Sequence, residues 1–169
     1  MRPARCLRVL AQNPGFERQT MNSLEIKIAQ WPELDGQWQT LVSQEFHADY
    51  IGIGEAYAGV HSVADKIAAM SAYEQEGLSV WAGWAGTRLA GLLAGKQTDS
   101  RLVLYDLFVG SDFRRQGMGR RLLECAMAGS GTREVAAEVN VQNPASQALF
   151  TALGFEKVLV SQWLVRRHS

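Results

Sequence analysis

The stretch YDLFVGSDFRRQGMGRRLL, residues 105–123, decides how this chain is interpreted. Its first part is apolar and ends at Val109, which is typical of a buried strand. Its last part carries apolar residues at helical spacing. Between the two, Arg114, Gly117 and Gly119 form the pattern R-x-x-G-x-G. The stretch therefore predicts a strand, a basic glycine turn and a helix in direct succession.

Such a turn is suited to a phosphate. The first N–H groups of a helix have no acceptor within the helix, and the helix N-terminus carries about half a positive charge. Glycine lets an anion approach the backbone, and the neighbouring arginines add charge. The pattern lacks the Gly-Lys-Ser/Thr of a P-loop and comes too late in the chain for a Rossmann fingerprint. A diphosphate site is the expectation, and a solvated basic helix start is the alternative.

Composition indicates an ordinary globular protein. The chain has 169 residues with 47% hydrophobic residues, and 17 basic residues balance 17 acidic ones. Zero net charge is evidence against a nucleic-acid partner. Cys6 and Cys125 suggest neither a disulfide framework nor a metal site. No apolar run reaches the roughly 20 residues that cross a membrane, and we expect a cytoplasmic protein.

The chain is expected to form one domain. Residues 1–20 are rich in arginine, lack periodicity and are expected to be a flexible extension. Met21 precedes the first regular pattern and is a candidate start. Residues 21–169 then constitute a single domain, with no internal repeat or linker.

Periodicity predicts an alternating order of elements. Strands are expected at 24–29, 78–84, 88–96, 101–109 and 135–139, with one or two more within 155–166. Helices are expected at 34–46, after Ser62, at 117–128 and at 144–153, with a glycine-rich loop at 50–60. Hairpins in the middle and one later crossover predict a mixed α/β fold. In it, helices flank both faces of a mostly antiparallel central sheet.

Two motifs together resemble a known family. The segment of residues 105–123 is similar to the acetyl-CoA-binding segment of the GCN5-related N-acetyltransferases (GNAT). The later segment NPASQALFTALGFEKV, from Asn143, resembles the second motif of the same family. The first segment is especially similar to small-molecule amine acetyltransferases, including aminoglycoside and polyamine types. The resemblance covers residues 78–166 and implies acetyl-CoA as donor and coenzyme A as product.

The resemblance also implies site residues. Strand residues would bind the pantetheine arm, and an N–H near Phe108 or Val109 would stabilise the thioester oxyanion. The glycine turn would hold the pyrophosphate. The implied cofactor-binding residues are Leu107, Phe108, Val109, Arg114, Arg115, Gln116, Gly117, Met118, Gly119, Arg120, Asn143 and Phe150.

Phe150 departs from the family pattern. The family often has a tyrosine there, which can protonate the leaving thiolate, and phenylalanine has no proton to give. Tyr105 or water would serve as the acid instead, or the thiolate would leave unaided.

A base is needed to deprotonate the amine acceptor. Asp106 is the first candidate and Glu138 the second. Alternation along the strand places Asp106 with Phe108 on one face, and Tyr105 with Leu107 on the other. The structural alternative is that Asp106 pairs with a nearby arginine or caps an element.

The acceptor is expected to be the primary amine of a small molecule, attacked directly in a ternary complex. Acids and aromatics near the end of the first helix could bind a cationic amine. The alternatives are an acetyltransferase acting on protein N-termini or lysines, and a catalytically silent acyl-CoA-binding module. A homodimer is a candidate assembly, and the sequence does not decide the oligomeric state. The candidate acceptor residues are Glu45, His47, Asp49, Tyr50, Glu55 and Tyr57.

Overall fold

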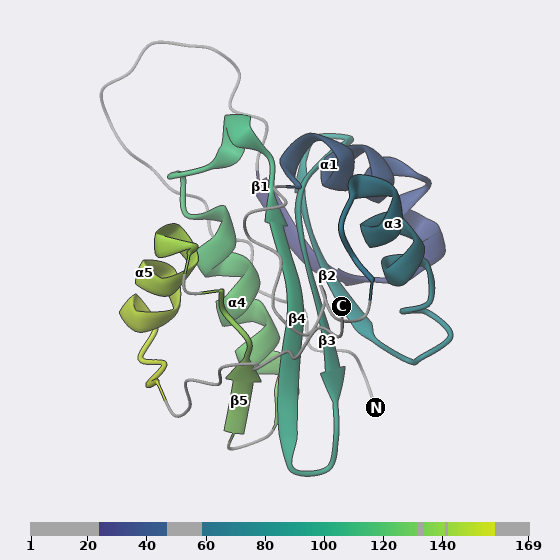
Figure 1. Ribbon diagram of the computed structural model, residues 1–169. Helices are drawn as coiled ribbons and strands as arrows, with labels where there is room; N and C mark the ends of the chain where they lie inside the picture. The colour runs from purple at the N-terminus through teal and green to yellow at the C-terminus, as the bar shows by residue number, and fades with distance from the viewer. Residues whose placement is uncertain (1–23, 47–58, 132–133, 141, 158–169) are drawn as a thin grey trace, which may run out of the picture.

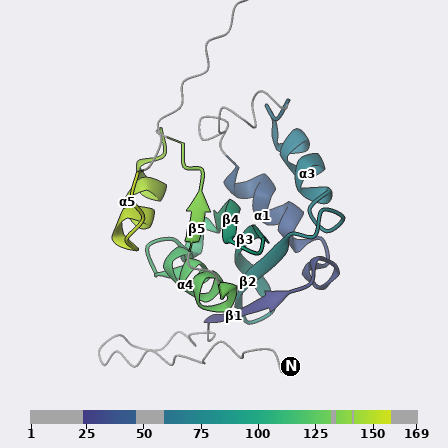
Figure 2. The ribbon, with the colours of Figure 1, turned by 90° about the horizontal axis from the view of Figure 1, so that it is seen from below.

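A five-stranded sheet separates two pairs of helices. The computed structural model describes residues 24–46, 59–131, 134–140 and 142–157. Helices α1 and α3 cover one face of the sheet, and α4 and α5 lie on the other (Figures 1 and 2). The four helices span Gln37–Glu45 (α1), Val63–Ser71 (α3), Met118–Ser130 (α4) and Pro144–Ala152 (α5).

The strands follow the chain order across the sheet, β1-β2-β3-β4-β5. The first three pairings are antiparallel, and the last, between β4 and β5, is parallel. Helix α4 makes the crossover between these two strands, as a parallel connection requires. The strands span Leu24–Ala29 (β1), Ser79–Ala85 (β2), Arg88–Gln97 (β3), Arg101–Val109 (β4) and Glu134–Ala137 (β5).

The first helical region is shorter than the sequence predicts. A 3-10 helix, η1, spans Trp31–Leu34, and α1 begins only at Gln37. Asp35 and Gly36 both have positive φ, at 41° and 72°, so the backbone cannot continue as one right-handed helix through them. Trp31 is anchored by its indole Nε1, which donates to the carbonyl of Leu78 at 3.0 Å.

Helix α3 begins as predicted, with Ser62 as its N-cap. The Ser62 hydroxyl accepts from Asp65 N and donates to the Asp65 carboxylate. The hydrogen bonds that the Ser62 hydroxyl and the His61 N–H donate to the Asp65 carboxylate hold the pKa of that group below its ordinary value. The helix ends at Ser71, earlier than expected, and turns lead to Gly77, whose φ is 73°.

Two apolar clusters hold the layers together, one on each face of the sheet. The first packs α1 and α3 on the sheet through Trp38, Val42 and Met70. The second packs α4 and α5 through Leu122, Leu123 and other residues that include Phe150. Because each helix buries one stripe of side chains, both faces of the sheet are covered.

A pair of glycines determines how closely α4 approaches the sheet. Gly83 and Gly91 are register partners on β2 and β3. A Cβ built on Gly83 would lie 2.4 Å from the Met118 sulfur, and one on Gly91 would lie 3.1 Å from Met118 Cγ and from the carbonyl oxygen of Phe108. Met118 is the first residue of α4 and is fully buried. Because Gly83 and Gly91 have no side chain, Met118 can pack directly on the sheet, and this contact sets the position of the α4 N-terminus.

The mixed sheet with helices on both faces confirms the fold predicted from sequence. The predicted strand at 135–139 is observed at Glu134–Ala137, and the helix expected to start at Gly117 begins one residue later. Phe155–Lys157 form no strand, and the rest of the last predicted strands lies outside the described residues, as do residues 1–23 and most of the loop at 50–60. Among the helices that the structure describes, none is both long and apolar enough to cross a membrane.

We predict that Gly91→Ala destabilises the protein by about 1–3 kcal/mol, because the added methyl overpacks the contact with Met118. Gly129→Ala is the matched control. Gly129 lies within α4 with open space around it, so alanine should stabilise the helix by about 0.5–1 kcal/mol. Chemical denaturation measures both changes. Equal stability of Gly91→Ala and the wild type would contradict this account of α4 packing.

Candidate functional site

Strand β4 extends beyond its parallel partner. Its pairing with β5 runs from Arg101↔Glu134 to Leu104↔Ala137 and stops there. Beyond this point, Asp106, Leu107, Phe108 and Val109 remain paired with β3 on their other side. In the part of the chain that the structure describes, nothing pairs with the opposite edge of these residues. This open edge of β4 therefore offers backbone groups to a ligand.

The direction of the free groups follows from strand alternation. Gly110 N–H donates to the carbonyl of Ala90 at 2.9 Å, toward β3. Adjacent residues of a strand direct their N–H groups to opposite sides, so every second residue directs its N–H to the same side. The N–H of Phe108, two residues before Gly110, therefore also points to β3. Leu107 and Val109 then direct theirs to the open edge. An N–H that binds the cofactor from this edge belongs to Leu107 or Val109, and not to Phe108.

Tyr105 forms a β-bulge. Ala94 pairs with Asp106 and Gly95 pairs with Leu104, which leaves Tyr105 as the extra residue on β4. The side chain is 52% exposed, and its ring centroid lies 6.4 Å from that of Tyr73, which packs against the α1 and α3 side. The expectation that Tyr105 shares a face with Leu107 is therefore wrong, because the bulge interrupts the alternation.

The glycine turn leads from β4 into α4. Gly117 is the N-cap of α4 with φ 83°, and its side chain, a hydrogen, cannot occupy the helix N-terminus. The first intrahelical bond runs from Arg121 N to Gly117 O. The N–H groups of residues 118–120 therefore have no acceptor within the helix. Arg115 also has positive φ, at 60°, so the backbone of the turn is left-handed at both Arg115 and Gly117.

The side chains of the turn differ in whether they are free to contact a ligand. Arg115 is exposed, and Arg120 lies 3.3 Å from Glu124 and 3.4 Å from the carbonyl of Ala152. Gln116 donates to the carbonyl of Asp112 at 2.6 Å. Met118 is fully buried, so only its backbone can meet a ligand. Two of the predicted arginines, Arg115 and Arg120, thus flank the N-terminus of α4.

Arg114 is engaged elsewhere. Its guanidinium pairs with the carboxylate of Glu45, the last residue of α1, and its Nε donates to the carbonyl of Val109 at 3.1 Å. Glu45 is buried, although it was expected on the acceptor side. The other candidate acceptor residues, His47, Asp49, Tyr50, Glu55 and Tyr57, lie outside the described residues.

Asp106 belongs to a buried polar cluster beneath α3. One carboxylate oxygen pairs with the ammonium of Lys66, and the other accepts a hydrogen bond from the Tyr73 hydroxyl. Both charged side chains are nearly inaccessible to solvent, with exposed fractions of 3% for Lys66 and 8% for Asp106. The partner is a lysine from α3, whereas the sequence-based alternative named an arginine. The second candidate base, Glu138, follows the end of β5 and is exposed.

Residues of the second motif have structural roles in the described part of the chain. Asn143 is the N-cap of α5, and its side-chain oxygen accepts from Ser146 N at 3.0 Å. Phe150 is buried and packs edge-to-face on Phe155, with ring centroids 4.9 Å apart. Gly119 lies beneath α5, since a Cβ there would approach Leu149 to 3.1 Å. Contacts of Asn143 and Phe150 with a cofactor remain predictions.

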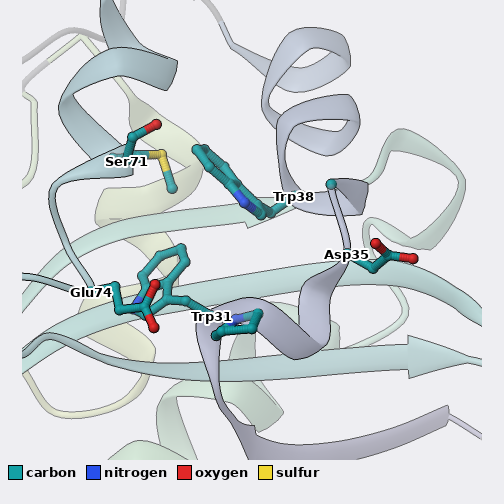
Figure 3. Close-up of a pocket in the computed structure, with 8 residues that line it drawn as sticks. Trp31, Asp35, Trp38, Ser71 and Glu74 are labelled. Carbon is teal, nitrogen blue, oxygen red and sulfur yellow. The ribbon is translucent and has the colours of Figure 1, made fainter.

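A shallow cavity of about 240 Å³ lies away from these residues (Figure 3). It opens between η1, α1 and α3, and Trp31 and Trp38 form part of its wall. None of the predicted catalytic or cofactor-binding residues lines it. We therefore place the candidate site at the open edge of β4 and the glycine turn, and not in this cavity.

Sequence reasoning missed Lys66 and Tyr73 and misjudged Glu45. A signal was present for both charged residues. Lys66 lies within the apolar stripe of α3 that includes Met70, and Glu45 lies within the stripe of α1 that includes Leu41 and Val42. A charge in an apolar stripe indicates a buried ion pair.

The comparison with protein families identifies the chain. The model described as "Acetyltransferase (GNAT) domain" matches residues 43–166, which is more than half of the chain. The chain belongs to the GNAT acetyltransferase family. It is thus an acyltransferase of the N-acetyltransferase class with acetyl-CoA as the donor. No protein of curated function matches its sequence.

Solved structures share the fold at low sequence identity. Aminoglycoside N-acetyltransferase AAC(6')-Iy in complex with CoA is 20% identical, with a TM-score of 0.63 over 86% of this chain and 95% of that one. AAC(6')-IG from Acinetobacter haemolyticus is 17% identical, with a TM-score of 0.62 over 86% and 99%. The ribosomal-protein-S18-alanine N-acetyltransferase from Escherichia coli is 20% identical, with a TM-score of 0.61 over 80% and 79%.

Proposed function

We propose that the protein transfers the acetyl group of acetyl-CoA to the primary amine of a small molecule. The observation that carries this proposal is the continuity of two backbone surfaces that can bind a ligand. The open edge of β4 leads directly into the glycine turn and the free N–H groups of α4. A thioester arm and a pyrophosphate are joined in the same order in coenzyme A.

Each surface has a distinct role in this proposal. Val109 binds the pantetheine arm as a neighbouring strand would, through its N–H. Leu107, next to the bulge, donates its N–H to the thioester oxygen and stabilises the oxyanion that develops there. The N–H groups of residues 118–120 hold the pyrophosphate, and Arg115 and Arg120 neutralise part of its charge.

The reaction is a direct transfer. The amine nitrogen attacks the thioester carbonyl carbon, the carbon–sulfur bond breaks, and the thiolate of coenzyme A leaves. The proton lost by the amine passes to a base, for which Asp106 is the candidate, with Tyr73 or water between them. Lys66 opposes this role, because an adjacent ammonium stabilises the ionised carboxylate.

The class of acceptor rests on two kinds of support. Aminoglycoside N-acetyltransferases are prominent among proteins of similar fold, and the sequence after α1 carries acids and aromatic residues. A protein N-terminus is the second candidate, since the Escherichia coli neighbour acetylates a ribosomal-protein alanine.

Thiol release from acetyl-CoA distinguishes the acceptors. We expect release with aminoglycosides or polyamines, and release near the no-acceptor rate with peptides that begin with alanine. Release with peptides alone would replace the small-molecule proposal with a protein acceptor. Silence with every amine, from protein that binds coenzyme A, would contradict both.

Gly117→Glu tests the pyrophosphate site. A carboxylate at the N-cap occupies the helix N-terminus and repels phosphate, so coenzyme A binding should be lost. Gly131→Glu is the matched control, because Gly131 caps the other end of α4, also with positive φ and open space. Each variant should lose about 1–2 kcal/mol of stability from backbone strain. Calorimetric titration should detect lost affinity only in Gly117→Glu, and unchanged affinity there would exclude this site.

The double variant Lys66→Met/Asp106→Asn tests the base. Lys66→Met alone should cost about 3–5 kcal/mol, because the buried carboxylate of Asp106 loses its ammonium counter-charge. The double variant removes both charges and should recover much of this loss. If Asp106 is the base, kcat of the double variant falls by about 100-fold or more while coenzyme A affinity is retained. A wild-type kcat would show that Asp106 serves only as the partner of Lys66.

A further inference from the structure

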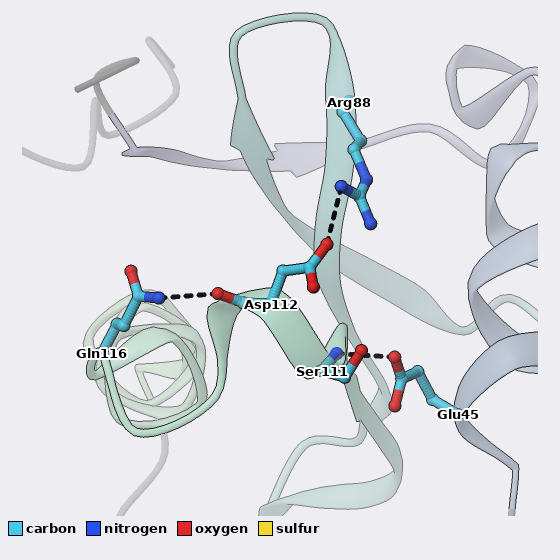
Figure 4. Close-up of polar contacts among 5 residues, drawn as sticks. All are labelled: Glu45, Arg88, Ser111, Asp112 and Gln116. Atoms are coloured by element: carbon cyan, nitrogen blue, oxygen red, sulfur yellow. Dashed lines mark hydrogen bonds and ion pairs between the residues drawn. The ribbon is translucent and has the colours of Figure 1, made fainter. Parts of the chain in front are cut away.

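The glycine turn is supported from the opposite face of the sheet by one carboxylate. Glu45 Oε1 accepts a hydrogen bond from Ser111 N at 2.6 Å, in the segment that follows β4 (Figure 4). Its Oε2 pairs with the guanidinium of Arg114. Both oxygens of Glu45 are therefore used to hold residues of the segment between β4 and α4.

The burial of the Glu45 carboxylate makes the loss of its contact with Arg114 costly. The Glu45 side chain is only 5% exposed, whereas that of Arg114 is 45% exposed. A buried carboxylate is costly unless it is paired, and removing one partner of such a pair is strongly destabilising. Arg114 therefore cannot leave Glu45 for a phosphate without leaving that carboxylate short of its counter-charge.

Arg114 also closes the turn onto the strand. Its Nε donates to the carbonyl of Val109 at 3.1 Å, and its backbone N donates to the carbonyl of Ser111 at 3.3 Å. The side chain and backbone of Arg114 thus join the end of β4, the segment after it and the end of α1. The three points fix the path of the backbone into the N-terminus of α4.

The other polar side-chain contacts of the segment are exposed and are expected to be weak. Arg88 pairs with Asp112 at 3.0 Å, with both side chains more than half exposed, and Gln116 donates to the carbonyl of Asp112 (Figure 4). Exposed ion pairs contribute little to stability. Apart from the apolar packing of Phe113 and Met118, the pair of Glu45 and Arg114 is therefore the polar contact of the turn with the more deeply buried member.

We propose that Glu45 and Arg114 are positioning residues for the donor, and that Arg114 is not a phosphate ligand. This inference rests on the proposed binding of pyrophosphate at the turn. The pair holds the turn in its binding conformation before the cofactor arrives, so binding does not have to order it. Phosphate charge is then met by the helix N-terminus with Arg115 and Arg120.

The proposal predicts a selective defect. Glu45→Gln retains the shape and one acceptor but removes the charge that holds Arg114. We expect the Kd of coenzyme A to rise about tenfold, the size of one lost charge-assisted hydrogen bond. S-acetylpantetheine carries the thioester arm without the pyrophosphate, so kcat/KM with this donor should be unchanged. Asp112→Asn is the matched control, an acid-to-amide change in the same segment at an exposed pair, and should bind coenzyme A as the wild type does.

A double-mutant cycle separates positioning from direct contact. If Arg114 acts through Glu45, then Arg114→Gln and Glu45→Gln/Arg114→Gln should weaken coenzyme A binding to the same extent. The double variant also contains no unpaired buried charge, so it serves where the single variant does not fold. Independent and additive losses would make Arg114 a phosphate ligand and overturn the proposal. An equal loss with both donors, or wild-type affinity in Glu45→Gln, would also overturn it.

The test of the positioning role can be distinguished from the test of the proposed pyrophosphate site. If Gly117→Glu leaves coenzyme A binding intact, the pyrophosphate site is elsewhere and the premise fails. If Gly117→Glu abolishes binding while Glu45→Gln does not weaken it, the site stands and only the positioning role is excluded.

Discussion

The candidate site depends on the point at which two parallel strands stop pairing. Leu104 and Ala137 form the last pair, and β4 continues for five residues with no partner on that side among the residues that the structure describes. Backbone N–H and C=O groups that are left unpaired must find other partners or water. The fold keeps these groups accessible at one edge and directs them toward the N-terminus of α4. A ligand with a peptide-like arm and an anionic end satisfies both surfaces at once.

Two charge pairs, each with a buried carboxylate, attach the helices of the other layer to this strand. Lys66 brings α3 to Asp106 in the middle of β4, and Glu45 brings α1 to Arg114 just beyond its end. A buried ion pair contributes little net stability compared with apolar packing, but it tolerates few alternative arrangements. Apolar packing thus stabilises the two layers, while the charge pairs determine which parts of α1 and α3 face the site.

The α4 helix obtains its position from small residues. Gly83 and Gly91 allow Met118 to lie directly on the sheet, and Gly117 allows the backbone to turn into the helix. The close packing on one side and the exposed N–H groups on the other belong to the same first turn of α4. A helix displaced by a methyl group would move its N-terminus away from the open edge of β4.

The sequence was informative wherever one local signal decided the structure. The glycine turn, the Ser62 cap and the order of strands and helices along the chain could be predicted, because turn residues and periodicity act over short distances. Pairings between distant segments could not be predicted. The β-bulge at Tyr105 depends on the register with β3, and the partner of Asp106 comes from a helix 40 positions earlier in the numbering (106 minus 66). The sequence alone therefore identified Arg114 as a phosphate ligand, although the structure places its side chain on Glu45.

Amide hydrogen exchange with and without coenzyme A tests the central claim most directly. If the cofactor binds along β4 and at the α4 N-terminus, exchange should slow at the N–H groups of Leu107, Val109 and residues 118–120. The N–H of Phe108 should change little, because it already faces β3. Protection confined to other segments, or no protection when coenzyme A is bound, would contradict this account.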